Sequence, residues 1–242
     1  MSSIYTGTSG FSYRDWKPRF YPKDLPAAKM LEHYASVLPM VEINNTFYRR
    51  PEKAHLEAWA ARVPSTFRFV FKASRYFSAG PGLRNAHKPL AEFFALLSAV
   101  KDKLGPVLVQ LPQHVKHDAS LLRDFIAAIP EGRRVALELV DPSWKTDAAM
   151  DAMRSRDVAW CVTETDAAPL DPITTASWGY FRLRKARYDE RALRAWARRL
   201  VEAKLDDAFV AFKHDDTGVA AKNAVTLFGL TNPKSASRPR RR

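Results

Sequence analysis

The stretch LGPVLVQLPQHVKHDASLLRDFIAAIPEGRRVALEL, residues 104–139, contains one complete strand–helix–strand unit. Val107–Val109 and Val135–Leu139 are short apolar runs bounded by turn residues, a pattern typical of buried strands. Between them, Ala119–Ile129 repeats apolar side chains three and four residues apart, as on one face of a helix. Strands joined through a helix pair in parallel by a right-handed crossover, so this stretch predicts a parallel α/β sheet.

The same alternation continues in both directions along the chain. The other expected strands are Ile4–Thr8, Met40–Ile43, Phe67–Phe71, Ala159–Val162, Tyr180–Leu183 and Phe209–Phe212. The other expected helices are Ala27–Val37, Glu52–Arg62, Pro89–Lys103, Asp189–Ala203 and Ala220–Leu230. Eight such strands predict an α/β fold, a TIM-like (β/α)8 barrel that forms a single domain over residues 1–232, with an open doubly wound sheet as the alternative. Thr165–Ser177 contains two prolines, so we expect a loop there and a barrel that is irregular around the sixth helix.

The chain has 242 residues, 46% of them hydrophobic, which is enough for a large core. Its formal net charge is +13. Residues 233–242 carry five basic and no acidic side chains and are predicted to be a disordered basic tail. Without them, 34 basic side chains still face 26 acidic ones, so we expect anionic partners: a small phosphorylated ligand or nucleic acid.

The cysteine content and the absence of long apolar runs limit the cellular compartments in which the protein is expected. Cys161 is the only cysteine, which excludes an internal disulfide, and its apolar neighbours suggest an inert core thiol. No run of 18 apolar residues suggests a membrane span, and the first residues lack the pattern of a secretory signal. We therefore expect a cytoplasmic protein without a membrane partner; the sequence does not indicate its oligomeric state.

Polar residues close all eight expected strands, where the active sites of parallel α/β barrels lie. Glu42 and Glu138 each stand between two apolar residues of a strand, so alternation turns the two acids toward the barrel axis. The other candidate residues at strand ends are Ser9, Asn44, Lys72, Gln110, Arg182, His214 and Asp215. Two glutamates and a lysine can perform acid–base chemistry, and Lys72 can instead clamp an anion or form a Schiff base. The alternative is a buried acid that pairs with Arg182 or Lys72 for structure alone.

No metal or cofactor motif is visible. The sequence contains no HExxH, paired CxxC, P-loop, GxGxxG or nucleophile-elbow pattern. Glu164, Asp166, His214 and Asp215 match no defined metal spacing, so no metal ligands are assigned and the cofactor stays unknown.

Aromatic and basic side chains suggest further binding surfaces. Aromatic rings near the expected mouth, among them Tyr48 and Trp144, can stack on sugars or bases, although packing of loops is the simpler explanation. Arg187, Arg191, Arg194 and Arg198 form one basic stripe at helical spacing. Such a stripe is usually a solvated face but can also follow the phosphates of a nucleic acid.

Several ordered motifs resemble the YecE-like family, classed as domain of unknown function 72. They include GTSGFSYRDW at residues 7–16, VEINNTFYR at 41–49, FVFKAS at 69–74 and LGPVLVQLP at 104–112. Further matches are Glu138 with Pro142–Trp144, Tyr180–Leu183 and the Asn223-Ala224 pair, which adds Asn223 to the candidate binding residues. The resemblance spans about residues 4–230 and implies a TIM-barrel-like fold; it supplies no reaction.

Three positions depart from the family pattern at the expected mouth. Val140 replaces an arginine that often follows the strand-five glutamate, Arg184 stands where histidine is frequent, and His214 replaces an asparagine. We predict an enzyme of hydrolase or isomerase type that acts on an anionic, phosphate-containing substrate. Its catalytic residues would be Glu42, Lys72 and Glu138. The alternatives are a non-catalytic nucleic-acid-binding protein and a degenerate barrel that serves as a scaffold.

Overall fold

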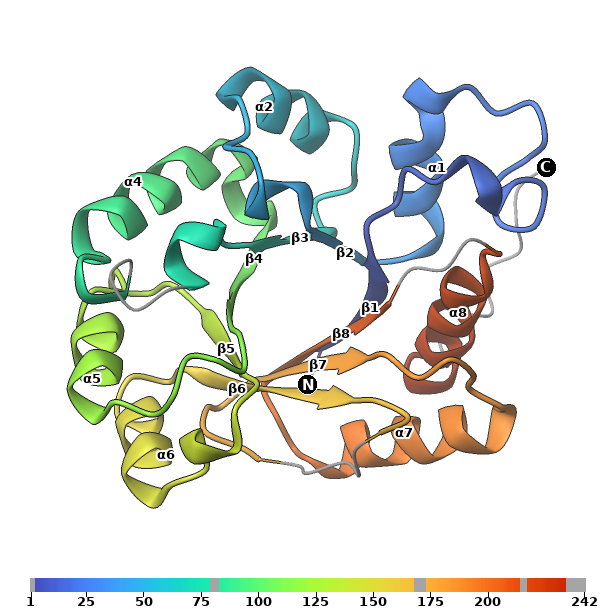
Figure 1. Ribbon diagram of the computed structural model, residues 1–242. Helices are drawn as coiled ribbons and strands as arrows, with labels where there is room; N and C mark the ends of the chain where they lie inside the picture. The colour runs from blue at the N-terminus through green and yellow to red at the C-terminus, as the bar shows by residue number, and fades with distance from the viewer. Residues whose placement is uncertain (1–2, 79–82, 168–172, 214–216, 234–242) are drawn as a thin grey trace.

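The computed structural model describes residues 3–78, 83–167, 173–213 and 217–233. Eight strands form a closed barrel in sequence order, and every neighbouring pair is parallel (Figure 1). The strands are β1 Ser3–Ser9, β2 Met40–Ile43, β3 Arg68–Lys72, β4 Leu104–Leu111, β5 Val135–Leu139, β6 Ala159–Glu164, β7 Gly179–Leu183 and β8 Asp207–Phe212. The predicted TIM-like barrel is confirmed, and closure between β8 and β1 excludes the open sheet.

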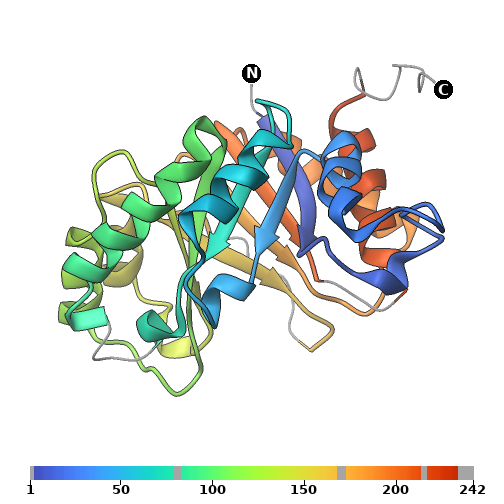
Figure 2. The same ribbon diagram turned by 90° about the horizontal axis from the view of Figure 1, so that it is seen from above.

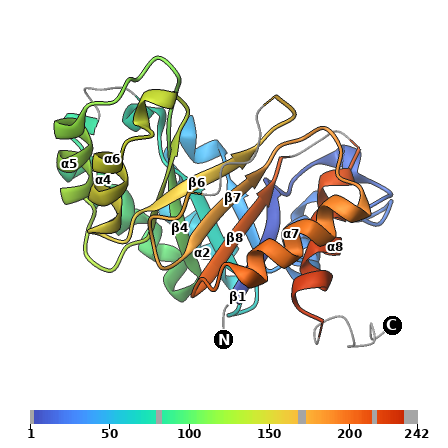
Figure 3. The ribbon, with the colours of Figure 1, turned by 90° about the horizontal axis from the view of Figure 1, so that it is seen from below.

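Helices surround the barrel on the outside (Figure 1). They are α1 Met30–Val37, α2 Lys53–Ala61, α4 His87–Leu97, α5 Ala119–Ala127, α6 Asp147–Arg154, α7 Glu190–Glu202 and α8 Val219–Thr231. Short 3-10 helices are η1 Arg14–Trp16, η2 Ala27–Lys29, η3 Asn45–Phe47, η4 Arg75–Ser78, η5 Ser98–Lys103 and η6 Pro142–Trp144. The strand arrows all run toward one side of the molecule in Figures 2 and 3, so the carboxyl ends of the strands form one mouth.

Two helical segments differ from the sequence expectation. The single helix expected over Pro89–Lys103 is α4 followed by η5, and Lys101, with a φ of 56° in the left-handed region, interrupts η5. Helix α6 was not expected, because Ala149 and Met153 are its only buried residues and form a weak apolar stripe. The Thr146 hydroxyl caps it by accepting a hydrogen bond from the Ala149 amide at 3.2 Å. Between β6 and β7, the described residues form no helix, as the two prolines predicted.

The core has two parts, because successive side chains of each strand point alternately out of and into the barrel. Outward-facing residues such as Val41, Ile43, Leu137 and Leu139 pack in one large cluster with the helices. Inward-facing residues form a second cluster inside the barrel: Met40, Val70, Leu108, Ala136, Ala159, Cys161, Trp178, Tyr180, Phe209 and Ala211. The inner cluster fills the barrel below the mouth, so the barrel is a packed core on which the mouth residues stand.

The first strand and the last helix meet at the opposite end of the barrel from the mouth. The Asn232 side chain, just after α8, donates a hydrogen bond to the Ile4 carbonyl at the beginning of β1. The predicted tail beyond this point lies outside the described residues, apart from Pro233. Among the described residues, no helix is long and apolar enough to cross a membrane.

Candidate functional site

Six strands place a polar side chain two residues beyond one that packs inside the barrel. The pairs are Met40 and Glu42, Val70 and Lys72, Leu108 and Gln110, Ala136 and Glu138, Cys161 and Thr163, and Tyr180 and Arg182. Side chains two residues apart on a strand share a face, so the second members also face the axis, one layer nearer the mouth. The predicted orientation of both glutamates is therefore confirmed.

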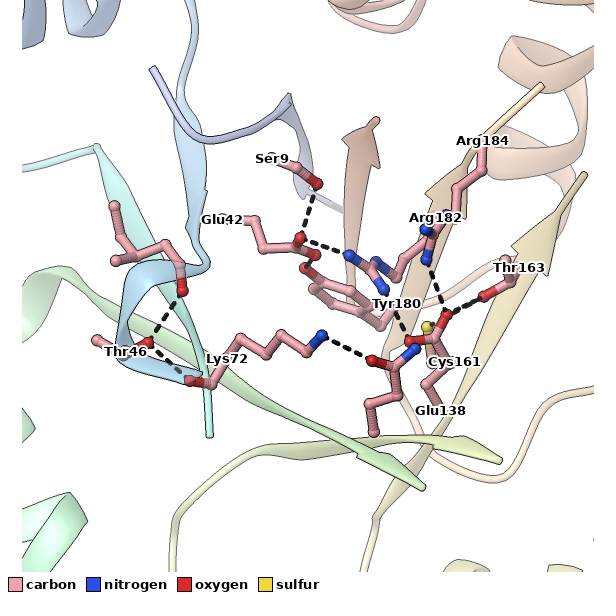
Figure 4. A network of polar contacts seen from close by, with 12 residues as sticks. Ser9, Glu42, Thr46, Lys72, Glu138, Cys161, Thr163, Tyr180, Arg182 and Arg184 are labelled. Carbon is pink, nitrogen blue, oxygen red and sulfur yellow. Dashed lines mark hydrogen bonds and ion pairs between the residues drawn. The ribbon is translucent and has the colours of Figure 1, made fainter. Parts of the chain in front are cut away.

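Arg182 on β7 lies at the centre of this mouth layer (Figure 4). Its Nη2 donates to Glu42 Oε1 at 2.8 Å, and its Nη1 donates to Glu138 Oε2 at 2.7 Å. Only 5% of the residue is exposed, so both ion pairs are shielded from water. One guanidinium thus joins β2 and β5 across the barrel and compensates two buried carboxylates at once.

Glu42 has no solvent exposure and has two further hydrogen-bond donors. The Ser9 hydroxyl donates to its Oε1 at 2.7 Å, and the Tyr180 hydroxyl donates to its Oε2 at 2.6 Å. Burial opposes ionisation of Glu42, but the Arg182 charge and these hydrogen bonds outweigh it and hold its pKa below the usual range. Burial and the neighbouring Glu42 raise the pKa of Tyr180 well above its usual value, so Tyr180 stays a donor.

Glu138 makes two contacts besides its ion pair with Arg182. The Thr163 hydroxyl donates to its Oε1 at 2.9 Å. A guanidinium nitrogen of Arg184, which is partly exposed, is 3.7 Å from the same oxygen. Arg184 is one of the departures from the family pattern, and the structure places its charge directly beside the network.

Lys72 ends β3, and the two groups in direct contact with its amine are neutral. Its Nζ donates to Gln110 Oε1 at 2.6 Å and lies 4.2 Å from the centre of the Phe47 ring. Burial and, next, the Arg182 charge lower the pKa of Lys72. The Thr46 hydroxyl donates to the Lys72 carbonyl at 2.6 Å and so ties η3 to the end of β3. Figure 4 shows the Lys72 side chain extending toward the network around Arg182.

The structure thus brings together six of the predicted residues. Ser9, Glu42, Glu138 and Arg182 form one hydrogen-bonded network, and Lys72 and Gln110 form a pair beside it. Asn44 follows β2, and its Oδ1 is buried with no hydrogen-bond partner among the described residues. Tyr48 is 76% exposed and packs edge-on against Phe47, which brings it near the Lys72 side of the mouth.

The remaining predicted residues do not join the network. Trp144 is fully buried, its indole donates to the Val115 carbonyl at 2.8 Å, and its ring packs edge-on against His117. No face of that ring is open to a ligand, so we no longer place Trp144 among the binding residues. Asn223 is buried on α8, the helix that packs against β1 and α7. His214 and Asp215 lie outside the described residues.

Three members of the network were not chosen as catalytic or binding residues from the sequence: Thr163, Tyr180 and Arg184, of which Thr163 and Arg184 were recognised only as residues at strand ends. Each lies on the inward face of its strand or directly beyond it, at a two-residue spacing from Cys161 or Arg182. Counting by twos from the inner residues would have found them. Cys161 itself is buried with its Sγ 3.8 Å from Thr163 Oγ1, and burial raises the pKa of its thiol. In the described part of the chain, no group of three or more His, Cys, Asp or Glu side chains could hold a metal ion.

A family model described as "Protein of unknown function DUF72" matches residues 5–242. The chain belongs to this family. Two curated relatives are both named as UPF0759 proteins. YunF of Bacillus subtilis (strain 168) is 30% identical over 105 residues, and YecE of Escherichia coli (strain K12) is 27% identical over 142 residues. These matches cover 43% and 58% of the chain, and 35% and 50% of the two relatives. The chain therefore matches no more than half the length of these two relatives.

Solved structures of DUF72 family proteins are similar over almost the whole chain. The protein from Thermotoga maritima superposes with a TM-score of 0.77 at 23% identity and covers 98% of this chain and all of that one. The protein from Enterococcus faecalis gives a TM-score of 0.77 at 20% identity and 95% coverage of both chains. At these identities the similarity establishes the shared barrel fold. The DUF72 match confirms the resemblance drawn from the motifs.

Proposed function

We propose that the protein is an enzyme of hydrolase or isomerase type that acts on a small anionic, phosphate-containing molecule at the mouth of the barrel. The observation that carries the proposal is the charge of the mouth layer. Lys72, Arg182 and Arg184 supply three positive charges against the two negative charges of Glu42 and Glu138, which leaves a formal charge of +1. A net positive charge attracts anions.

The contacts suggest how the charges divide their work. Arg182 is buried and holds both glutamates, so its charge is balanced within the protein. The excess charge lies on Lys72 and Arg184, which are only partly buried. These two side chains would contact the anion, and Gln110 and Asn44 would orient the rest of the molecule. Guanidinium groups suit phosphate because their donors are arranged in a fixed fork.

The two glutamates then take different roles. Glu138 contacts both Arg182 and Arg184, so it would transfer protons near the bound anion. Glu42 is enclosed by Ser9, Tyr180 and Arg182 and would act as a positioning residue for Arg182. An enzyme needs both a place for the substrate and a group that moves protons; in this proposal Lys72 and Arg184 would hold the substrate and Glu138 would move the protons.

Binding of inorganic phosphate to Arg184→Gln tests the proposal. A hydrogen bond to a charged group contributes about 1.5–3 kcal/mol, so we expect affinity to fall about 10- to 150-fold in isothermal titration. Arg187→Gln is the matched control, because Arg187 is exposed, three residues away, and not part of the network. Equal affinities of the two variants would contradict the assignment.

Nucleic-acid binding is a second candidate, supported by a groove on α7. Arg191, Arg194 and Arg198 line it together with Leu230 of α8, and its volume is about 590 Å³. Glu190 neutralises Arg194 at 2.6 Å, whereas Arg191 and Arg198 have no acidic partner among the described residues. If this face follows a phosphate backbone, duplex DNA binding should weaken with salt, with a slope of about −0.9 per phosphate contact. Arg191→Gln with Arg198→Gln should reduce that slope by about two such contacts; an unchanged slope would remove this candidate.

A further inference from the structure

A pocket of about 270 Å³ lies at the opposite end of the barrel from the mouth. The strands that line it contribute only from their first three residues. Its charged residues are Arg68 at the beginning of β3, Arg133 and Arg134 directly before β5, and Asp207 at the beginning of β8. This is the side away from the strand arrowheads in Figure 3. A water molecule takes about 30 Å³ in the liquid, so the pocket has room for a small ligand.

The pocket carries an excess of positive charge. Three arginines and one aspartate line it, which gives a formal charge of +2. Asp207 accepts a hydrogen bond from Arg134 Nη1 and so compensates that arginine. Arg68 and Arg133 form no ion pair with a carboxylate in the described part of the chain. Like charges around one cavity repel each other, and a bound anion would relieve that repulsion.

Arg68 is held in place but keeps donors for a ligand. Its Nη1 donates to the Ser65 carbonyl at 2.8 Å and to the Phe67 carbonyl at 3.0 Å. Its guanidinium carbon lies 5.5 Å from the centre of the Tyr5 ring, which stacks on Phe209. No described residue accepts a hydrogen bond from its Nη2 or Nε. A side chain that is already fixed loses less conformational entropy when a ligand binds.

The two arginines before β5 follow a turn that leaves space beside the pocket. Gly132 has a φ of 69°, and a Cβ at this position would meet no atom within 4 Å. The guanidinium carbon of Arg134 lies 5.6 Å from the centre of the Trp178 ring, and that of Arg133 lies 5.9 Å from the centre of the Phe94 ring. Arg133 forms no hydrogen bond with a described residue, so all its donors are available to a ligand.

We propose that this pocket binds phosphate, either as the free ion or as the terminal group of a small molecule, and is an anion site separate from the mouth. Guanidinium donors form a planar fork that matches the oxygens of phosphate, and three guanidinium groups border this one cavity. The active sites of parallel barrels lie at the carboxyl ends of the strands, so we assign binding and no reaction to this end. A ligand that binds only the folded chain stabilises it, so phosphate bound here would oppose unfolding.

Isothermal titration of the full chain with inorganic phosphate tests the proposal. Loss of one charge-assisted hydrogen bond weakens binding about 10- to 150-fold, so Arg133→Gln should lower the affinity of this pocket by that factor. Arg123→Gln is the matched control, because it removes the same charge from an exposed position on α5 that is not part of the pocket. Urea unfolding verifies that both variants are folded. Equal phosphate binding by the two variants would overturn the proposal.

The same two variants, each combined with Arg184→Gln, separate this pocket from the mouth. Phosphate binding that is lost with Arg133 and unaffected by Arg184 would support this pocket and contradict the proposed function. Binding that is lost with Arg184 and unaffected by Arg133 would overturn the pocket and support the proposed function. Partial loss with each would support both sites, and the mouth is then titrated in the Arg133→Gln background.

A second set of ligands identifies the source of the phosphate. Tighter binding of glycerol 3-phosphate than of inorganic phosphate would support a phosphate ester as the ligand, and the reverse order would support the free ion. Duplex DNA that binds through Arg133, without binding of either small phosphate, would overturn the proposal.

Discussion

Two layers of the same barrel, two residues apart along each strand, differ completely in chemistry. The lower layer consists of packed side chains such as Met40, Val70 and Leu108. The mouth layer holds charged groups that are nearly as buried: Glu42, Glu138 and Arg182. The backbone is the same in both, so the difference lies in how each side chain is stabilised. The lower layer is stabilised by the removal of apolar surface from water, whereas the mouth layer is stabilised by the pairing of its buried carboxylates with Arg182.

Removal of Arg182 should break the mouth layer most severely. Arg182→Met leaves Glu42 and Glu138 buried without a cation, and a broken buried ion pair costs about 3–5 kcal/mol of stability. Urea unfolding at pH 7 measures the loss. The triple variant that also carries Glu42→Gln and Glu138→Gln should recover much of it, because no buried carboxylate without a cation then remains. A stable Arg182→Met single variant would show that the network is dispensable.

Acid should weaken the same network by protonating Glu42. Its folded-state pKa is depressed, so its contribution is complete above the unfolded pKa, about 4.3, and is lost as pH falls toward the folded value. The stability difference between wild type and Glu42→Gln should therefore be constant near neutrality and shrink below about pH 4.3. Urea titrations over this range measure it. A difference that grows on acidification would contradict the sign of the shift.

Loss of one hydrogen bond should have a smaller effect. Tyr180→Phe removes the donor to Glu42 Oε2 and keeps the packing of the ring in the lower layer. A hydrogen bond to a charged group contributes about 1.5–3 kcal/mol, so we expect a loss in this range. Tyr34→Phe is a comparison at a neutral site, since its hydroxyl meets Thr8 and the Met40 carbonyl. Equal losses at both sites would mean that the charge of Glu42 adds nothing.

The smallest effect is expected at the rim. Tyr48 is 76% exposed, and surface substitutions usually change stability by less than about 0.5 kcal/mol. Tyr48→Ala should therefore unfold like the wild type, while its phosphate affinity reports whether the rim touches the ligand. A loss of stability as large as that of Tyr180→Phe would show that Tyr48 supports η3.

The fold was predictable because its signal is local. Eight apolar runs with helices between them indicate a parallel barrel, and each run overlaps an observed strand. Helix α6 escaped because Ala149 and Met153 give it only two buried residues, although the Thr146 cap could have been recognised. The break at Lys101 also escaped, because a left-handed residue other than glycine has no signature in hydrophobic periodicity.

The candidate site was predictable only in part. Alternation along one strand turns Glu42 and Glu138 inward, and the structure agrees. Their shared partner, Arg182, is 140 residues from Glu42 and 44 residues from Glu138 in the sequence. Such distances become contacts only through closure of the barrel and its register. Trp144 was predicted as a binding residue because it is an aromatic ring near a strand end. In the structure it is a buried core residue.

The most direct test of the division between the layers compares Leu108→Ala with Arg184→Gln in two measurements, urea unfolding and phosphate titration. Leu108 is buried in the lower layer, so its truncation should cost about 2–5 kcal/mol of stability and leave phosphate affinity unchanged. Arg184→Gln should weaken phosphate binding about 10- to 150-fold and change stability by less than about 1 kcal/mol. Phosphate affinity that survives in Arg184→Gln, or that falls equally in Leu108→Ala, would contradict a ligand site built on the mouth layer.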